Sequence, residues 1–394
     1  MKNGMMGSLL LATVLFWAGC KGFWVSSSTG GGTACTTNCT SLSSGVFYVL
    51  NSYSDHAEIA GYSIIQGALT PLAGSPYSLA VGPYAIAIVP NGKYLYVSTQ
   101  SGIYLYTIGA GGVLTLSSAA PVFTDYAAYS IQVDATGSWL LDASGAGYLY
   151  AFPIGAATGV PAGAVQQVSL GGIVPRQMTV SPDNKNVFVA LGTSGTGVVP
   201  FSAAATNPWP SKLASIISVS RAGGAAVSVA VDPGNRLLYV GETMGVAGTS
   251  NTGILRAFSY DSLSGTPAEV AGSPFASGGL TPVSILPVAL GAYVYVANAN
   301  VYNSSNGNVA GFSVISTGAS YDVTPLSSTA AAGITPAGMV ADTTGSVVLL
   351  VNSGGSPDLN VFSFDTTYPG KLDAAYAFAM GADPAGTLAI ASAP

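Results

Sequence analysis

The sequence is poor in charge. Only 7% of its 394 residues are Asp, Glu, Lys or Arg, and the formal net charge is −6. The ten lysines and arginines are scattered along the chain and form no basic patch, which argues against a nucleic-acid partner. Low charge combined with 49% hydrophobic residues instead favours a chain that buries much of its length.

Histidine is almost absent. The single histidine, His56, excludes a metal site built from several imidazoles, and no nucleophile elbow of the G-x-S-x-G type stands in a strand–turn–helix context. We expect His56 to be a solvated loop residue beside Asp55 and Glu58. Because no spacing of acidic residues matches a calcium loop either, we expect no metal and no cofactor.

Cysteine is also rare, with three in the chain. Cys35 and Cys39 stand in the short segment Cys-Thr-Thr-Asn-Cys, and two thiols are too few for a zinc site. In an oxidising compartment they can form a small disulfide loop, or stay as free or intermolecular thiols. Their spacing leaves both alternatives open.

A helical period of apolar residues is missing outside the first twenty residues. Instead, one pattern returns at a period of about 50 residues: an apolar strand, a turn with Asp, Pro and Gly, a Tyr/Val-rich strand, and a third strand ending in an aromatic residue. Its copies are residues 85–108, 129–152, 177–190, 227–259, 282–314 and 336–364. Asp, Pro and Gly each favour tight turns, so every copy begins with a hairpin. The repeat predicts an all-β protein, a β-propeller with four-stranded antiparallel blades.

The array begins and ends within a unit. Residues 46–50 match the repeat from its second strand onward, and residues 377–390 match its first two strands around the turn 383–386. Pairing of the two chain ends in one blade would close the ring and remove its exposed edges. We therefore predict seven blades with one surplus terminal strand at an edge, and eight blades as the alternative.

The N-terminus carries a targeting pattern. Lys2 precedes an apolar run over residues 9–20, which indicates a signal peptide over residues 1–19. Ala18, Gly19 and Cys20 resemble the lipobox of bacterial lipoproteins, although Trp17 replaces the usual Leu. This resemblance implies a lipid on Cys20, an exported protein, and an outer-membrane or periplasm-facing location, with the cell surface as a further option. An ordinary signal peptide with an incidental Cys is the alternative.

The organisation that follows is simple. Residues 20–44 are rich in Ser, Thr and Gly and are expected to be a flexible tether. Residues 45–394 are expected to form the propeller. The only membrane contact that we expect is the N-terminal anchor.

Three segments carry a family resemblance: residues 67–77, 90–97 and 265–275. They resemble the bacterial β-propeller lactonase family, which includes seven-bladed 6-phosphogluconolactonases and many lipoproteins of unassigned activity. Surface-layer proteins with Tyr-Val-Thr-Asn (YVTN) repeats look similar. The resemblance covers residues 45–394 and implies a seven-bladed propeller.

The resemblance can be followed residue by residue in one blade. Residues 175–178 are similar to the family's Pro-Arg-His-Met, with Arg176 kept and Gln177 in place of the His. Gly192 stands where the family carries a Glu, and Glu242 occupies the corresponding place one blade later. This implies that Arg176 stabilises an oxyanion or holds a carboxylate or phosphate, and that Glu242 acts as a base on water. The alternatives are an Arg176 that satisfies inner-strand carbonyls and a Glu242 at a solvated loop end.

Three tyrosines lie near predicted blade entries. Tyr84, Tyr129 and Tyr376, together with Gln177, are candidates for ligand contacts at the rim of the propeller, although packing alone would explain the tyrosines. Three functions remain open: an envelope module that binds a small molecule or an envelope protein without catalysis, a lactonase acting on a sugar or other lactone, and a structural or adhesive surface protein.

Overall fold

A computed structural model describes residues 44–123, 127–162, 165–209, 213–243, 252–260, 267–288, 291–318 and 320–393. The predicted signal peptide, Cys20, and the Cys35 and Cys39 pair lie outside these residues, as does nearly all of the predicted tether. Within the described ranges, no helix is long and apolar enough to cross a membrane.

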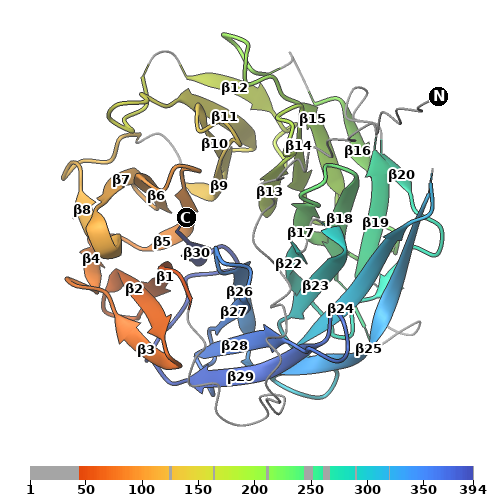
Figure 1. Ribbon diagram of the computed structural model, residues 1–394. Coiled ribbons are helices and arrows are strands. Elements are labelled where there is room, and N and C mark those ends of the chain that lie inside the picture. The colour runs from red at the N-terminus through yellow and green to blue at the C-terminus, as the bar shows by residue number, and fades with distance from the viewer. Residues whose placement is uncertain are drawn as a thin grey trace, which may run out of the picture.

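The described strands form seven antiparallel sheets arranged as blades around a central axis (Figure 1). We number the blades from 1 to 7 in chain order, blade 1 being the one that contains both ends of the propeller. Each blade runs from an inner strand beside the axis to an outer strand at the circumference. Helix is almost absent from the described residues, apart from short turns such as η1 (Ala110–Gly112).

The strands of blades 1 to 7 follow in that order. The inner strands are β30 (Ile390–Ser392), β5 (Pro83–Ile88), β9 (Ala128–Val133), β13 (Gln177–Val180), β17 (Ala226–Val231), β22 (Pro282–Val288) and β26 (Pro336–Ala341). The second strands are β1 (Phe47–Ser52), β6 (Tyr94–Thr99), β10 (Trp139–Ser144), β14 (Asn186–Ala190), β18 (Leu237–Glu242), β23 (Tyr293–Asn298) and β27 (Val347–Asn352). The third strands are β2 (Ala57–Ile65), β7 (Gly102–Ile108), β11 (Tyr148–Pro153), β15 (Thr196–Pro200), β19 (Ile254–Tyr260), β24 (Asn306–Ser316) and β28 (Leu359–Phe364). The outer strands are β3 (Ala68–Pro71), β8 (Leu114–Leu116), β12 (Gln166–Ser169), β16 (Ser215–Ile217), β20 (Pro267–Glu269), β25 (Tyr321–Ile334) and β29 (Leu372–Phe378), and β4 (Tyr77–Leu79) and β21 (Phe275–Ala276) add short pairings to blades 1 and 5.

Hydrogen bonds that recur in the hairpin turns explain why the repeat folds into blades. The carboxylate of Asp134 accepts hydrogen bonds from the backbone N–H groups of Ser138 and Trp139, both at 2.7 Å. Asp342 receives the N–H groups of Ser346 and Val347 in the same way, both at 2.8 Å. A buried Asp thus satisfies the amides that the turn leaves unpaired.

Ring closure by the two chain ends is confirmed, and the number of blades is seven. β30 pairs with β1, aligning Ile390 with Val49. The surplus terminal strand was wrong, because residues 377 and 378 belong to outer strand β29. The segment at 383–386 is not a hairpin turn between two strands, since the carbonyl of Asp383 accepts the N–H of Ser52 at 2.8 Å.

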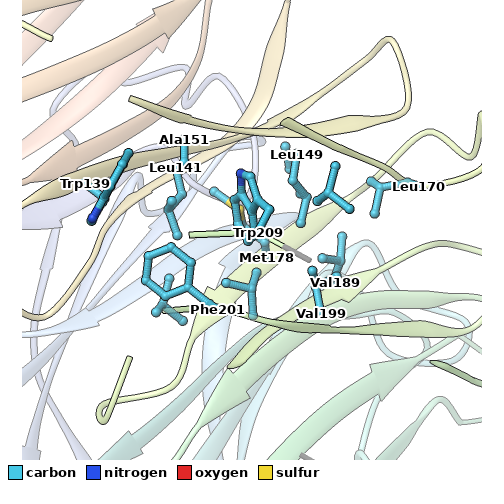
Figure 2. Packing of buried hydrophobic residues seen from close by; sticks show 14 of the residues in the cluster. Trp139, Leu141, Leu149, Ala151, Leu170, Met178, Val189, Val199, Phe201 and Trp209 are labelled. Atoms are coloured by element: carbon cyan, nitrogen blue, oxygen red, sulfur yellow. The ribbon is translucent and has the colours of Figure 1, made fainter. Parts of the chain in front are cut away.

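The hydrophobic core lies between neighbouring blades. Figure 2 shows one such cluster, in which Trp139 and Leu141 of blade 3 face Met178 and Val189 of blade 4. Every blade of the closed ring is covered by a neighbouring blade on each side, so its strands are apolar on both faces.

Candidate functional site at the entry rim

One face of the propeller gathers most of the predicted site residues. Successive strands in a blade run in opposite directions, so the starts of the inner strands and the ends of the second strands lie on the same face. We call it the entry face. The hairpin turns that join inner and second strands lie on the opposite face, which we call the turn face.

The entry face has a ring of equivalent positions at the starts of the inner strands. In blade 2, Tyr84 is skipped in the pairing between Pro83 and Ala85, which makes it a β-bulge. In blade 3, Tyr129 is skipped in the same way. Bulges redirect a side chain away from the regular pleat. We call these positions the entry rim.

The two halves of the rim carry different kinds of side chain. The six equivalent positions of blades 2 to 7 are skipped in the pairing, or, in blade 4, directly precede it, and they hold Tyr84, Tyr129, Arg176, Val227, Val283 and Ala337. Blades 2 to 4 therefore carry two phenols and a guanidinium at these positions, whereas blades 5 to 7 carry aliphatic side chains, of which Val283 and Ala337 are buried in the core. The rings of Tyr84 and Tyr129 meet edge to face, with centroids 5.2 Å apart.

Arg176 lies on this rim, and its guanidinium forms no ion pair with the described residues. Its backbone N–H donates to the carbonyl of Ala190 at 2.8 Å. Its side chain is exposed, and within the described part of the chain the guanidinium has no hydrogen-bond or ion-pair partner. It lies over Gly192, where an added Cβ would be 3.9 Å from Nε of Arg176. An exposed guanidinium of this kind can hold a carboxylate or phosphate through two parallel hydrogen bonds.

Gln177, predicted to contact a ligand, joins two blades instead. Its side chain is buried, and its Oε1 accepts the N–H of Val229 in blade 5 at 2.9 Å. The equivalent Ser130 accepts the N–H of Met178 in the next blade at 3.1 Å. This register position therefore links neighbouring inner strands, and the amide oxygen of Gln177 is not free for a ligand.

Glu242 is also committed, and it is not a solvated loop end. It is 1% exposed at the end of β18. Its Oε1 accepts from Nη1 of Arg256 at 2.9 Å, and its Oε2 accepts from both N and Oγ of Ser220 at 2.9 Å. A carboxylate with both oxygens engaged is a poor base for water.

Arg256 is the centre of this network. Beyond Glu242, its guanidinium binds both carboxylate oxygens of Glu269 at 2.9 and 2.8 Å and the carbonyl of Ser218 at 2.8 Å. The hydrogen bond from Arg256 lowers the pKa of Glu269, against the opposing effect of burial. The network ties strands β18, β19 and β20 to the loop before β17. The sequence signal for this network was the opposite charge of Glu242 and Arg256, which stand on strands adjacent in the sequence.

Tyr376 does not lie on the rim. It belongs to β29, the outer strand of blade 7, and its hydroxyl is buried without a hydrogen-bond partner in the described residues. The prediction failed because residues 377–390 were assigned to a terminal hairpin, which placed Tyr376 at a blade entry.

His56 lies on the entry face between β1 and β2, at the side of blade 1. Its Nδ1 is 2.7 Å from Oδ1 of Asp55, its Nε2 is 3.9 Å from Oε2 of Glu58, and its ring stacks on Tyr53 with centroids 4.5 Å apart. The hydroxyl of Tyr53 donates to the carbonyl of Gly381 at 2.6 Å. The Tyr53 contact fixes the segment that leads into β30. The imidazole of His56 is half exposed and lies beside Asp55 and Glu58, as the sequence analysis expected.

No group of three or more His, Cys, Asp or Glu side chains in the described ranges could hold a metal ion. Among the described rim positions, the polar side chains are one guanidinium and two phenols.

The fold and the rim together define a class: an all-β, seven-bladed propeller whose entry face carries a cationic and aromatic arc. Its structural neighbours are 6-phosphogluconolactonase-like proteins. A provisionally named 6-phosphogluconolactonase of Bacteroides uniformis covers 88% of this chain and 99% of its own, with 17% identity and a TM-score of 0.66. A second, from Bacteroides fragilis, covers 88% and 97%, with 16% identity and a TM-score of 0.64.

A third similar structure is a periplasmic gluconolactonase of Pseudomonas aeruginosa. It covers 89% of this chain and 100% of its own, with 16% identity and a TM-score of 0.63. No protein-family model matches the sequence, and no curated protein matches it. At these identities the likeness shows the fold.

Proposed function

We propose that the entry rim binds a small anionic ligand rich in hydroxyl groups, of the sugar-acid type, and that the protein is a lactonase-like propeller that serves as a binding module. The observation that carries the proposal is the exposed guanidinium of Arg176, which has no partner among the described residues and lies on the same ring of positions as Tyr84 and Tyr129. A guanidinium selects a carboxylate or phosphate, and phenol rings offer an apolar face with a polar tip.

Adjacent inner strands bring these groups to one side of the rim. The N–H of Met178 donates to Oγ of Ser130, so β13 lies beside β9. Tyr129 comes one residue before Ser130, Arg176 comes two residues before Met178 and directly precedes β13, and Tyr129 contacts Tyr84. The three side chains therefore occupy neighbouring blades 2, 3 and 4.

The residues predicted for catalysis fit a protein that binds a ligand without hydrolysing it, because they include no available base. Lactone hydrolysis requires a base that activates water and a donor for the developing oxyanion. Arg176 can supply the donor. Glu242 is tied to Arg256 and Ser220, and Gly192 has no side chain, so neither supplies the base.

The test is calorimetric titration of the full-length protein with gluconate and with glucose. We expect Arg176→Ala to weaken gluconate binding by about 10- to 100-fold, since hydrogen bonds to a charged group contribute about 1.5–3 kcal/mol. Lys93→Ala is the matched control, because it removes one exposed positive charge from the turn face. Equal losses in the two variants would mean that net charge, and not the rim, attracts the ligand.

Hydrolysis of a sugar lactone is the second candidate, favoured by the names of the three neighbouring structures. Release of acid from a small panel of lactones would measure it, comparing the unaltered protein with Arg176→Ala and Glu242→Gln. Activity that persists equally in all three proteins would place any lactonase chemistry away from the rim.

We also propose that the protein is exported and anchored by a lipid on Cys20, on the strength of the apolar run and the Ala18-Gly19-Cys20 pattern. Metabolic labelling with palmitate should mark the unaltered protein and be lost in Cys20→Ser. Labelling that survives this change would exclude the anchor.

A further inference from the structure

A single acidic residue occupies a position that is aliphatic in every other blade. Asp142 of β10 pairs with Ile131 of the inner strand of blade 3. The second-strand residues at the same register are Val49, Val97, Val189, Val240, Val296 and Leu350, which pair with Ile390, Ile86, Met178, Val229, Ile285 and Met339. The repeat therefore specifies an apolar side chain here, and blade 3 departs from it.

Asp142 points into the packed seam between blades 2 and 3. Its neighbours Leu141 and Ala143 belong to the cluster on the other side of blade 3, where Figure 2 shows Leu141. Side chains alternate along a strand, so Asp142 faces the same way as Leu140, which packs in the seam. Its register partners Ile131 and Tyr150 pack there too.

Nothing in the described structure balances this carboxyl group. Asp142 is 0% exposed, and neither Oδ1 nor Oδ2 has a hydrogen-bond partner. No other Asp, Glu, Lys or Arg lies on the described strands of blades 2 and 3. The titratable groups that share the seam are Tyr94, Tyr96, Tyr148 and Tyr150, and the first two donate their hydroxyls to the carbonyls of Ala157 and Gly159.

The same seam ends at the entry rim. Tyr84 belongs to blade 2 and Tyr129 to blade 3, so their edge-to-face contact bridges the two blades directly above the apolar packing. Any loosening between β5 and β9 separates these rings. The proposed ligand site therefore depends on the state of the seam.

We propose that Asp142 is a pH-dependent switch that keeps blades 2 and 3 together while its carboxyl group is neutral and loosens them, and the Tyr84–Tyr129 pair, when it ionises. The switch itself rests on the seam, and its effect on ligands rests on the function proposed for the rim. An isolated carboxylate in a dry, apolar interface is strongly disfavoured, so ionisation requires water to enter.

The direction of the response follows from the burial. Burial raises the pKa of Asp142 well above its usual range. The folded protein therefore keeps a proton that the unfolded chain has already lost, and stability falls as pH rises between the two pKa values. The seam is tightest in acid and weakest in alkali.

Hydrogen exchange of the full-length protein at pH 5 and pH 9, corrected for intrinsic rates, tests the switch without a ligand. We expect exchange in residues 83–88, 128–133 and 139–144 to be about tenfold faster at pH 9, the change that one pKa unit corresponds to. Asp142→Val installs the side chain that five other blades carry, and it should show equal protection at both pH values. Asp142→Asn should also remove the pH response, and Asp322→Asn, an exposed change on β25, should keep it.

An equal pH response in the unaltered protein and in Asp142→Val would overturn the switch, and so would a loss of protection spread evenly over all seven blades. Titration with gluconate at the two pH values forms a separate arm. Binding that weakens at pH 9 only when Asp142 is present supports the coupling to the rim. Absence of gluconate binding at either pH contradicts the proposed function alone, because the exchange experiment still decides the switch.

Discussion

Removing Arg256 should cost more stability than removing either of its acidic partners. Arg256→Leu leaves Glu242 at 1% exposure without its cation, while Ser220 remains as its only donor in the described ranges. Glu269 also loses two hydrogen bonds, but its side chain is 33% exposed and water can replace them. The damage is therefore concentrated on one buried charge.

The burial of each partner sets the expected loss in the free energy of unfolding. Breaking a buried ion pair from one side costs about 3–5 kcal/mol, because the remaining charge is left uncompensated. We expect Arg256→Leu to fall in that range. Glu242→Gln keeps a group that can accept the Ser220 N–H and should cost about 1–2 kcal/mol. Glu269→Gln should cost less than about 1 kcal/mol, as exposed pairs do.

Urea unfolding followed by far-ultraviolet circular dichroism gives the free energy of unfolding for each variant. The decisive protein is the double variant Arg256→Leu with Glu242→Met, which removes both charges of the buried pair. It should be more stable than Arg256→Leu alone, since no unpaired carboxylate is left inside. If Arg256→Leu costs under about 1 kcal/mol, or if the two costs simply add, the buried-charge reasoning is wrong.

Three further outcomes are expected. Arg256 lowers the pKa of Glu269, so this ion pair stabilises the protein fully above the pKa that Glu has in the unfolded chain. That stabilisation is lost as pH falls through the lower pKa of Glu269 in the folded protein. Arg256→Leu should therefore flatten the acid limb of a pH–stability curve. Gln177→Ala leaves the N–H of Val229 unpaired and should cost about 1–3 kcal/mol in urea unfolding, with gluconate affinity unchanged; a fall in affinity would return Gln177 to the site. Tyr129→Ala should weaken gluconate binding several-fold by calorimetry, whereas Tyr376→Ala on the outer strand should not, and equal effects would count against the rim.

The fold was accessible from the sequence because its signals are local. Each turn carries Asp, Pro or Gly at positions whose role is complete within the hairpin, as Asp134 and Asp342 show. The terminal hairpin at 377–390 failed for the opposite reason. Its Asp383 and Pro384 resemble the other turns, yet the first binds Ser52 and the second bridges to Asn51, at the far end of the chain. Tertiary contacts overrode the local pattern.

The site was only partly accessible from sequence, for a related reason. Arg176 and Tyr129 could be placed because each stands at a fixed distance from a turn in its own repeat. The fate of Gln177 could not, since its partner Val229 comes 52 residues later, in another blade. Glu242 required knowledge of which strand lies opposite, because Arg256 reaches it across a hairpin. Repeat position predicts where a residue lies, whereas its partner comes from the neighbouring strand or blade.

The three-residue strand β30 has a consequence for the order of folding. Blades 2 to 7 pair strands that are close in the chain, so each can form soon after its own segment is synthesised. Blade 1 cannot, because Val49 has to wait for Ile390. Closing a loop of that length costs about 3 kcal/mol more entropy than closing a hairpin. The ring is therefore expected to stay open until the segment up to Ser392 has arrived, so a nascent chain would complete its propeller in one late step.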